Sequence, residues 1–312
     1  MDMIPTRDGF GQELVALGKE RDDIVVVSAD LEDATRAEYF KKEFPDRFFN
    51  LGIAEQDVIG TAVGLSMQGY VVFASSFAVF MTNRAYDQIR IDVCQNNANV
   101  KIVCSHAGIT VGEDGATAQC FEDFAIMRVL ANMSVVCPVD TNEAKSATRW
   151  MVDHYGPVYM RTSRAAFPVL TKEDDVFEFG KARIMREGKD VTLIGSGLMV
   201  YESLQAAEIL KKEGIDARVI NLHTLKPLDE DALVACAKET GAIVTAEEHQ
   251  IIGGMGSAVA EVLSQKYPTP IEMVGIKDVY GETGDPQGLL KKYHLKDVDI
   301  AEAAKKVIKR KK

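Results

Sequence analysis

The sequence is poor in the residues that build disulfide frameworks and metal sites. Its 312 residues include only five cysteines and five histidines. No CxxC, HxxH or HExxH spacing occurs among them. An odd number of scattered cysteines is typical of reduced thiols in a cytosolic protein. We therefore expect neither structural disulfides nor a metal site built by this chain.

Long apolar runs and an excess of positive charge are also missing. No run approaches the ~18–20 apolar residues of a membrane span, and the start MDMIPTRDGF lacks the apolar core of a signal peptide. The net charge of −11 argues against nucleic acid as the main ligand, because phosphate backbones need a cationic face. The basic tail Lys305–Lys312 is typical of a solvated helix end. These features predict a cytoplasmic protein without membrane or nucleic-acid partners.

What the chain does have is an alternation of short β-branched runs and helical stripes, which predicts layered α/β domains with a parallel sheet. In the first half we expect strands at Ile24–Ala29, Tyr70–Ala74, Val100–Ser105, Met133–Cys137 and Pro157–Met160, and helices at 55–68, Phe77–Cys94, 119–131 and Asn142–Asp153. In the second half we expect strands at Val191–Gly195, Ala217–Asn221, Ala242–Ala246 and Ile271–Val274, and helices at Tyr201–Glu213, Asp229–Thr240 and Gly256–Gln265.

The alternation lapses between Thr162 and Lys189. This segment contains Pro168, a run of charged residues and two glycines, a composition typical of a linker between domains. We therefore predict a first domain at 1–165, a linker at 166–188 and a smaller second domain at 189–312.

Three segments of the first half combine residues that suit a ligand site. In NLGIAEQD, Glu55 falls at a predicted helix start, where the helix dipole alone would favour a carboxylate. In SSFAVFMTNRAYDQI, Phe77 and Phe80 suit either a helix core or an aromatic platform. The loop SHAGITVGEDGATAQ follows a predicted strand, where open α/β sheets place ligands. Each segment alone has an ordinary structural explanation.

Taken together, the three segments resemble the pyrimidine-binding domain of the transketolase family of thiamine-diphosphate enzymes. The resemblance is carried by GIAEQDVIGTAVGL, FASSFAVF, RAYDQIR and HAGITVGEDGAT. It continues in the second half through VTLIGSG, AEEHQIIGGMGSAVAE and GETGDPQGLL. The resemblance implies a pyrimidine-binding thiamine-diphosphate fold followed by a transketolase C-terminal domain, and transfer of a two-carbon ketol unit between sugar phosphates.

On the cofactor side, the resemblance implies that Glu55 contacts the N1′ ring nitrogen of the aminopyrimidine. That role needs a protonated carboxyl group, and hence a pKa raised by burial. Phe77 and Phe80 resemble the aromatic residues that pack on the pyrimidine ring. Asp30 and Leu31, in SADL, match the segment that lines the cofactor pocket.

On the substrate side, Arg7 and Arg164 match family arginines that hold a sugar phosphate, and a guanidinium fork suits phosphate oxygens. His106 matches the histidine beside them, and we count it with Glu55 as catalytic. Asp114 resembles the acid that contacts substrate hydroxyls. Without the family pattern, these residues have the plain interpretations of a helix-start arginine, a linker arginine and a strand-end histidine.

The sequence departs from the family pattern at three places. Ala34 stands where the family offers a phosphate-binding serine, with the hydroxyl of Thr35 adjacent. Ala118 replaces a histidine that touches the substrate near the reacting carbons. Asn83 stands where some relatives carry another aromatic residue. The first two losses affect the substrate side, so thiamine chemistry is better supported than the usual pentose-phosphate substrates.

No GDG…N motif for the Mg²⁺ that anchors the cofactor's diphosphate occurs in this sequence. The resemblance therefore implies a split enzyme, in which an N-terminal subunit carries the diphosphate and Mg²⁺ site. A symmetric α2β2 heterotetramer is the expected assembly. Two alternatives stay open: the beta subunit of an α-keto-acid dehydrogenase first component, and a non-catalytic paralogue whose substrate face has decayed.

Overall fold

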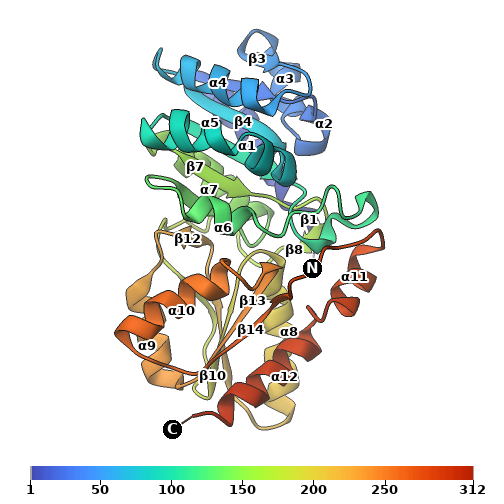
Figure 1. Ribbon diagram of the computed structural model, residues 1–312, viewed down its shortest axis with the longest axis vertical. Helices are drawn as coiled ribbons and strands as arrows, with labels where there is room; N and C mark the ends of the chain where they lie inside the picture. The colour runs from blue at the N-terminus through green and yellow to red at the C-terminus, as the bar shows by residue number, and fades with distance from the viewer. Residues whose placement is uncertain (1, 312) are drawn as a thin grey trace.

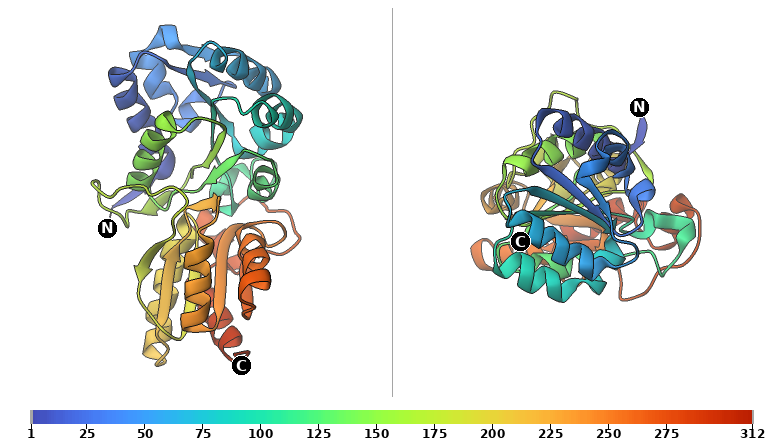
Figure 2. Two further views of the ribbon diagram at one scale, coloured as in Figure 1. Left: turned by 90° about the vertical axis from the view of Figure 1, so that its left-hand side faces the viewer. Right: turned by 90° about the horizontal axis from the view of Figure 1, so that it is seen from above.

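The computed structural model describes residues 2–311, which fold into two α/β units stacked along the long axis of the molecule (Figure 1). This agrees with the predicted fold class of two layered α/β domains. The N-terminus lies near the middle of the molecule and the C-terminus at the far end of the second unit (Figures 1 and 2).

The first unit is built on a seven-stranded sheet in the order β12-β6-β7-β5-β4-β2-β3. All neighbours pair in parallel except β12 with β6. The strands are β2 (Ile24–Ser28), β3 (Phe48–Asn50), β4 (Val71–Phe77), β5 (Val100–Ser105), β6 (Ser134–Val136), β7 (Val158–Arg161) and β12 (Thr224–Lys226). β2, β4, β5 and β7 are buried along their whole length, as expected for a parallel sheet covered on both faces.

Helical segments cover this sheet: α1 (Thr6–Glu20), α2 (Glu32–Thr35), α3 (Glu38–Glu43), η1 (Pro45–Arg47), α4 (Glu55–Ser66), η2 (Phe80–Arg84), α5 (Tyr86–Gln88), η3 (Ile89–Gln95), η4 (Ile109–Asp114), α6 (Asp123–Arg128) and α7 (Thr141–Asp153). The helix expected from Phe77 starts later, because β4 continues through Phe77. It is then irregular, since η2 and η3 are π-helical. Short π-helical turns occur frequently at functional sites.

The second unit has a five-stranded sheet in the order β14-β13-β10-β11-β9, parallel except for β9. Its strands are β9 (Arg183–Arg186), β10 (Val191–Gly195), β11 (Ala217–Asn221), β13 (Ile243–Gln250) and β14 (Ile271–Ile276). Its helices are α8 (Leu198–Lys212), α9 (Glu230–Thr240), α10 (Met255–Lys266), α11 (Pro286–Lys292) and α12 (Asp297–Ile308). Within residues 2–311, no helix combines the length and the apolar character needed to cross a membrane.

The two units are joined by strands that the sequence pattern does not reveal. β12 follows β11 in the chain but pairs with β6 of the first sheet. β1 (Met3–Pro5) pairs with β8 (Ala166–Pro168) in a separate two-stranded sheet, and β8 lies in the expected linker. The domain boundaries at 165 and 189 remain a prediction. Both β8 and β9 lie inside the expected linker, so the linker is not an unstructured segment.

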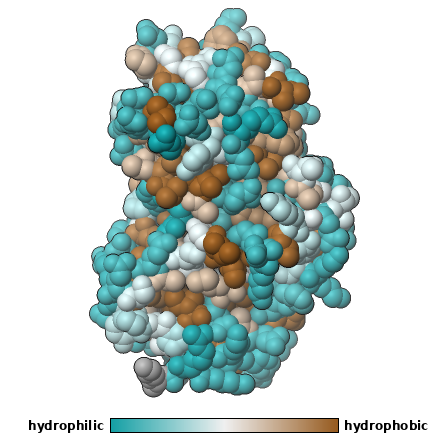
Figure 3. Space-filling model, in the orientation of Figure 1, coloured by the Kyte–Doolittle hydropathy of each residue, from teal (hydrophilic) through white to brown (hydrophobic). Residues whose placement is uncertain are grey.

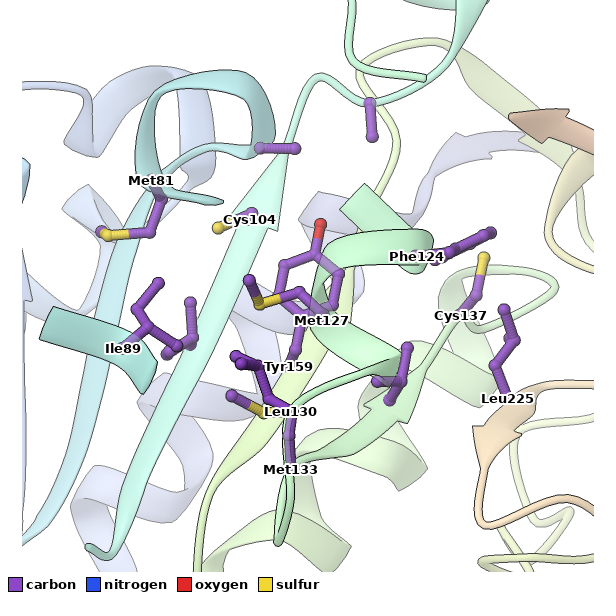
Figure 4. Close-up of a cluster of buried hydrophobic side chains, with 14 of the residues drawn as sticks. Met81, Ile89, Cys104, Phe124, Met127, Leu130, Met133, Cys137, Tyr159 and Leu225 are labelled. Atoms are coloured by element: carbon purple, nitrogen blue, oxygen red, sulfur yellow. The ribbon is translucent and has the colours of Figure 1, made fainter. Parts of the chain in front are cut away.

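Buried side chains between β5, α6 and β6 form a continuous core that includes four of the five cysteines (Figure 4). Cys104 and Cys137 line it together with Phe124 and Met127. The hydroxyl of Tyr159 points into this core and donates to Asp123 Oδ2 at 2.7 Å. All five cysteines are unpaired and buried. On the face shown in Figure 3, hydrophilic residues predominate and apolar residues form small separate patches.

Candidate active site

The carboxyl ends of β2, β3, β4, β5 and β7 lie at one edge of the first sheet, because these strands are parallel. The chain segments that leave this edge carry the predicted site residues. Asp30 and Leu31 follow β2, Glu55 follows β3, Phe77 and Phe80 end and follow β4, His106 and Asp114 follow β5, and Arg164 follows β7. Arg7 joins this edge from α1. The fold therefore brings residues from six separate segments to one place.

Glu55 begins helix α4 and is almost completely buried, with 1% of its surface exposed. Its Oε2 atom accepts a hydrogen bond from Nη1 of Arg84 at 2.8 Å. Its Oε1 atom is buried and has no hydrogen-bond partner among residues 2–311. Leaving a buried charged acceptor without a partner costs on the order of 1–3 kcal/mol or more. The geometry therefore suits a ligand that brings a hydrogen-bonding group to Oε1.

A row of flat side chains extends from Glu55 toward the substrate residues. Phe80 and Phe77 are stacked, with ring centres 5.6 Å apart. Phe77 stacks in turn on the imidazole of His106, with ring centres 3.7 Å apart. At the other end, the guanidinium of Arg84 lies 4.8 Å from the centre of the Phe80 ring. One face of Phe77 is therefore occupied by His106, which leaves Phe80 as the more accessible ring for a heterocycle.

Asp30 and Leu31 form the sharp turn between β2 and α2. Asp30 has a left-handed backbone with φ of 60° and is exposed. Its Oδ1 atom accepts a hydrogen bond from Nδ2 of Asn50, which ends β3, at 2.9 Å. Asn50 also donates toward Glu32 at 3.2 Å. Asn50 thus ties the end of β3 to the turn after β2, next to Glu55. The sequence analysis assigns no role to Asn50.

His106 is buried beside several positive charges. Its Nδ1 atom shares a hydrogen bond with Oγ of Ser105 at 2.8 Å, and its Nε2 atom lies 3.9 Å from Oδ2 of Asp114. Burial, together with the charges of Arg7, Arg164 and Arg36, lowers the pKa of His106 to about 3. The imidazole is therefore neutral at physiological pH, and it can donate or accept one hydrogen bond at Nε2 depending on its tautomer.

Two reciprocal hydrogen bonds bring the N-terminal helix to the substrate residues. The backbone N–H of Thr6 donates to Oγ of Ser163 at 3.0 Å, and the N–H of Ser163 donates to Oγ1 of Thr6 at 2.7 Å. Arg7 and Arg164 follow directly in sequence. Arg164 donates to the carbonyl of Val111 at 2.8 Å. The two predicted phosphate-binding arginines thus come from opposite ends of the first unit's sequence and are brought together by these hydrogen bonds.

Arg7 is the least satisfied of these cations. It donates from Nη1 to the carbonyl oxygen of Ala34 at 2.7 Å, while its buried Nε atom has no partner among the described residues. Burial lowers the pKa of Arg7, and the charges of Arg36 and Arg164 lower it further. Arg164, in contrast, is paired with Glu113 at 2.7 Å. Arg7 is thus placed to bind an anion.

The second unit supports the loop that carries His106 and Asp114. The N–H of Thr110 donates to Oε1 of Glu248 in β13 at 3.0 Å, and Nε2 of Gln119 donates to the carbonyl of Glu282 at 2.9 Å. Gly112 has a φ of +77°, and a Cβ atom there would lie 3.1 Å from Pro286 of α11. The second unit therefore positions substrate-side residues without contributing a predicted site residue.

The positions that depart from the family pattern are also defined. Thr35 is buried, and its hydroxyl donates to the carbonyl of Leu31 at 2.9 Å, so that proton is already used inside α2. Ala118 is buried at 7% exposure. Asn83 donates to Oε1 of Glu122 at 2.8 Å. Within residues 2–311, no group of three or more His, Cys, Asp or Glu side chains is arranged to hold a metal ion.

Sequence reasoning assigned no role to two arginines at this edge. Arg84 belongs to the RAYDQIR segment, but the helical pattern does not show that its side chain reaches Glu55. Arg36 carries no motif signal. It lies beside Arg7 and close enough to His106 for its charge to lower the pKa of both groups.

The chain is similar to known proteins over nearly its whole length. Residues 2–169 match the model of the transketolase pyrimidine-binding domain, and residues 180–300 match that of the transketolase C-terminal domain. The chain is 46% identical over 95% of its length to a putative transketolase C-terminal section of Methanocaldococcus jannaschii, covering 93% of that protein. It is 41% identical over 98% of its length to the 6-deoxy-6-sulfo-D-fructose transketolase subunit SqwH of Clostridium sp. strain MSTE9, covering 95% of it. A solved split gene transketolase, described as an inactive beta4 tetramer, superposes with a TM-score of 0.93 at 47% identity, covering 99% of this chain and 100% of that one.

Proposed function

This chain belongs to the transketolase family, and we propose that it is the C-terminal subunit of a split transketolase that works only with an N-terminal partner subunit. The proposed reaction is transfer of a two-carbon ketol unit from a ketose phosphate to an aldose phosphate. Thiamine diphosphate is the proposed cofactor, bound between the two subunits. The family matches favour this assignment over the beta subunit of an α-keto-acid dehydrogenase.

The observation that carries the proposal is the buried carboxylate of Glu55 beside the stacked rings of Phe80 and Phe77. One oxygen of this carboxylate has no partner among the described residues, although only 1% of the residue's surface is exposed. A flat heterocycle on Phe80 would bring a ring nitrogen to that oxygen. An aminopyrimidine has the shape and hydrogen-bonding groups that such a site requires.

Thiamine diphosphate supplies the carbon nucleophile and the electron sink that ketol transfer requires. The chain's own contribution is to bind, align and hold protons. Glu55 would hold a proton opposite a ring nitrogen, Phe80 would carry the flat ring, and Asp30 and Leu31 would close the pocket beside it. Burial of Glu55 keeps bulk water away from that proton.

On the substrate side, neutral His106 would exchange hydrogen bonds with the hydroxyl groups near the reacting carbons. Asp114, 3.9 Å from His106 Nε2, would accept from a further hydroxyl and orient the imidazole. Arg7 and Arg164 would hold the anionic end of the sugar, since guanidinium groups bind phosphate oxygens in fixed pairs. The relative that acts on a sulfonated sugar shows that anions other than phosphate are used in this family.

Magnesium would be held by the partner subunit. The metal prefers carboxylate, carbonyl and phosphate oxygens in octahedral geometry, and the described residues offer no cluster of this kind. A solved relative with 47% identity is a tetramer of the beta chain alone and is described as inactive, which supports a requirement for a partner here. An α2β2 heterotetramer remains the proposed assembly, because closed symmetric forms are the common solution.

The test is reconstitution. The purified chain is mixed with its N-terminal partner, thiamine diphosphate and Mg²⁺, and supplied with xylulose 5-phosphate and ribose 5-phosphate. Formation of sedoheptulose 7-phosphate is expected only when both subunits are present. A second donor, 6-deoxy-6-sulfofructose, is tested in parallel. Turnover of neither donor by the complete mixture would refute ketol transfer from these sugars and favour the non-catalytic paralogue.

A further inference from the structure

We infer that Arg36 is a third cation of the substrate-anion site formed by Arg7 and Arg164, and that it replaces the hydroxyl missing at position 34. This inference rests on the proposed function, because it concerns the anionic end of the same sugar substrate. It adds a specificity-determining residue to which the family pattern assigns no role.

The backbone is built to hold Arg36 at this place. Arg36 ends α2 in a left-handed conformation with φ of 67°, which costs a non-glycine residue on the order of 1 kcal/mol. Helix α1 approaches it closely through Gly11, where a Cβ atom would lie 2.7 Å from Cβ of Arg36. Two other residues of the site, Asp30 and His106, share this left-handed strain. Such strain gathers at functional sites more often than elsewhere.

The side chain of Arg36 is held in one orientation. Its Nε atom donates to Oδ1 of Asp8 at 2.6 Å, and its Nη1 atom donates to the carbonyl of Asp33 at 2.9 Å. The side chain is 27% exposed, so part of it remains open to solvent. A held guanidinium loses little further side-chain freedom when it binds an anion, which favours binding.

Arg36 also adds charge where an anion is needed. Burial is the largest cause of the lowered pKa of Arg7. The charge of Arg36 is the second cause and has a larger effect than the charge of Arg164. It contributes with the same two arginines to the low pKa of His106. Arg7 donates to the carbonyl of Ala34, two residues before Arg36, so the two arginines lie close together. The charge of Arg36 repels that of Arg7, and the ion pair of Arg36 with Asp8 offsets part of this charge. A dianionic phosphate, or a sulfonate, would relieve the repulsion and gain charge-assisted hydrogen bonds.

The competing explanation is that Arg36 has a structural role alone, in which it ties the end of α2 to α1 through Asp8. Arg47 provides a matched control, because its hydrogen bonds also tie a neighbouring segment to the end of α1. It donates to the carbonyls of Gly18 and Arg21 at 2.7 and 2.6 Å and lies over the ring of Phe44. None of these contacts involves the candidate site.

The first experiment measures binding of inorganic phosphate to the full chain by titration calorimetry. For Arg36→Gln we expect the affinity to fall by about 10- to 100-fold, the range given by a charge-assisted hydrogen bond. Arg47→Gln should bind phosphate as the wild type does. If Arg36→Gln does not fold, a folded Arg36→Lys variant should still lose several-fold. Equal affinity in the Arg36 variants and the wild type, or no phosphate binding by the wild type, would overturn the inference.

The second experiment uses the complex with the partner subunit and separates this inference from the proposed function. With a ketose phosphate donor, Arg36→Gln should raise KM by about 10-fold or more while kcat changes little. With the uncharged ketose erythrulose, KM should be unchanged. A sulfonated donor should show a smaller rise than the phosphate, since it carries one charge fewer. Equal effects on charged and uncharged donors would refute this role of Arg36 while leaving ketol transfer intact.

Discussion

Arg84 pairs with Glu55 and lies over Phe80 at the same time. Its Nη1 atom is 2.8 Å from Oε2 of Glu55, and its guanidinium carbon is 4.8 Å from the centre of the Phe80 ring. A guanidinium is flat, cationic and rich in hydrogen-bond donors. Arg84 thus lies over the Phe80 ring that an aminopyrimidine would use, and it is bonded to the carboxylate oxygen next to the Oε1 atom of Glu55 that has no partner among residues 2–311.

We therefore predict that Arg84 competes with the cofactor. In the complex of both subunits, Arg84→Ala should lower the Kd of thiamine diphosphate by about 5-fold, because a partly exposed ion pair is worth roughly 1 kcal/mol. The binding can be followed by calorimetry. Half of the Arg84 side chain is exposed, so the variant should fold.

Arg90→Ala is the control for this variant, because Arg90 is similarly exposed and, among residues 2–311, forms its ion pair with Asp87, three residues earlier in the chain. It should leave the Kd unchanged. Weaker cofactor binding by Arg84→Ala would show instead that Arg84 helps to hold the cofactor.

Replacement of Glu55 tests the chemistry of its carboxyl group. Glu55→Gln keeps the size and polarity of the side chain but removes the exchangeable proton. We expect the ketol-transfer rate of the complex to fall at least about 100-fold, the lower range for loss of a positioned acid or base. Thiamine diphosphate binding should change less than the rate. Glu261→Gln removes an Arg-paired glutamate far from this edge and should keep full activity. A Glu55→Gln variant with the wild-type rate would contradict the proposed role.

Glu143 predicts a pH dependence of stability. It is buried where α7 meets β11, and burial raises its pKa to about 7. The folded protein therefore binds this proton more tightly than the unfolded chain does, so the associated stability is present below pH ~4.5 and is lost as the pH rises through about 7. The shift corresponds to a free energy on the order of 3 kcal/mol.

Glu143→Gln should remove this loss. Glu143 accepts hydrogen bonds from Nδ2 of Asn221 at 2.8 Å and from the N–H of Val139 at 2.6 Å. Oδ1 of Asn221 is buried and has no hydrogen-bond partner within residues 2–311. The amide of Gln can keep one acceptor and also supply a donor to Asn221 after that side chain flips. In urea unfolding, the free energy of unfolding of the variant relative to the wild type should be higher at pH 8 than at pH 5. An equal effect at both pH values would argue against a titrating Glu143.

Two helix glycines should respond in opposite directions to the same substitution. At Gly9 in α1, a Cβ atom would come 2.2 Å from the carbonyl oxygen of Thr141, because α1 and α7 pack closely. Gly9→Ala should lower the free energy of unfolding by about 1–3 kcal/mol. At Gly60 in α4, nothing lies within 4 Å of the added atom, and Gly60→Ala should raise it by about 0.5–1 kcal/mol. Urea unfolding of the isolated chain measures both, and a tolerated Gly9→Ala would contradict the close packing.

Much of the fold could be predicted from local pattern. Buried parallel strands are short β-branched runs, and β2, β5, β10 and β11 appear within a residue of where the pattern places them. Helix α1 gave no clear signal, because Gly9, Gly11 and Gly18 weaken its helical stripe, and only packing against α7 and α3 explains them. β9 and β12 were missed for a related reason: a three- or four-residue strand is stabilised by its neighbours in the sheet and not by its own sequence.

By itself, the sequence determined which groups leave the carboxyl edge of the first sheet, because parallel strands place their ends together whatever the side chains are. It also determined that Glu55 starts a helix, since NLGIAEQ leads from a strand into an apolar helical stripe. Only the tertiary structure decided what each group faces. Three contacts join residues from different segments: Arg84 pairs with Glu55, His106 covers Phe77, and Arg36 lies near Arg7. Such contacts depend on how helices pack on the sheet, and no local pattern in the chain encodes them.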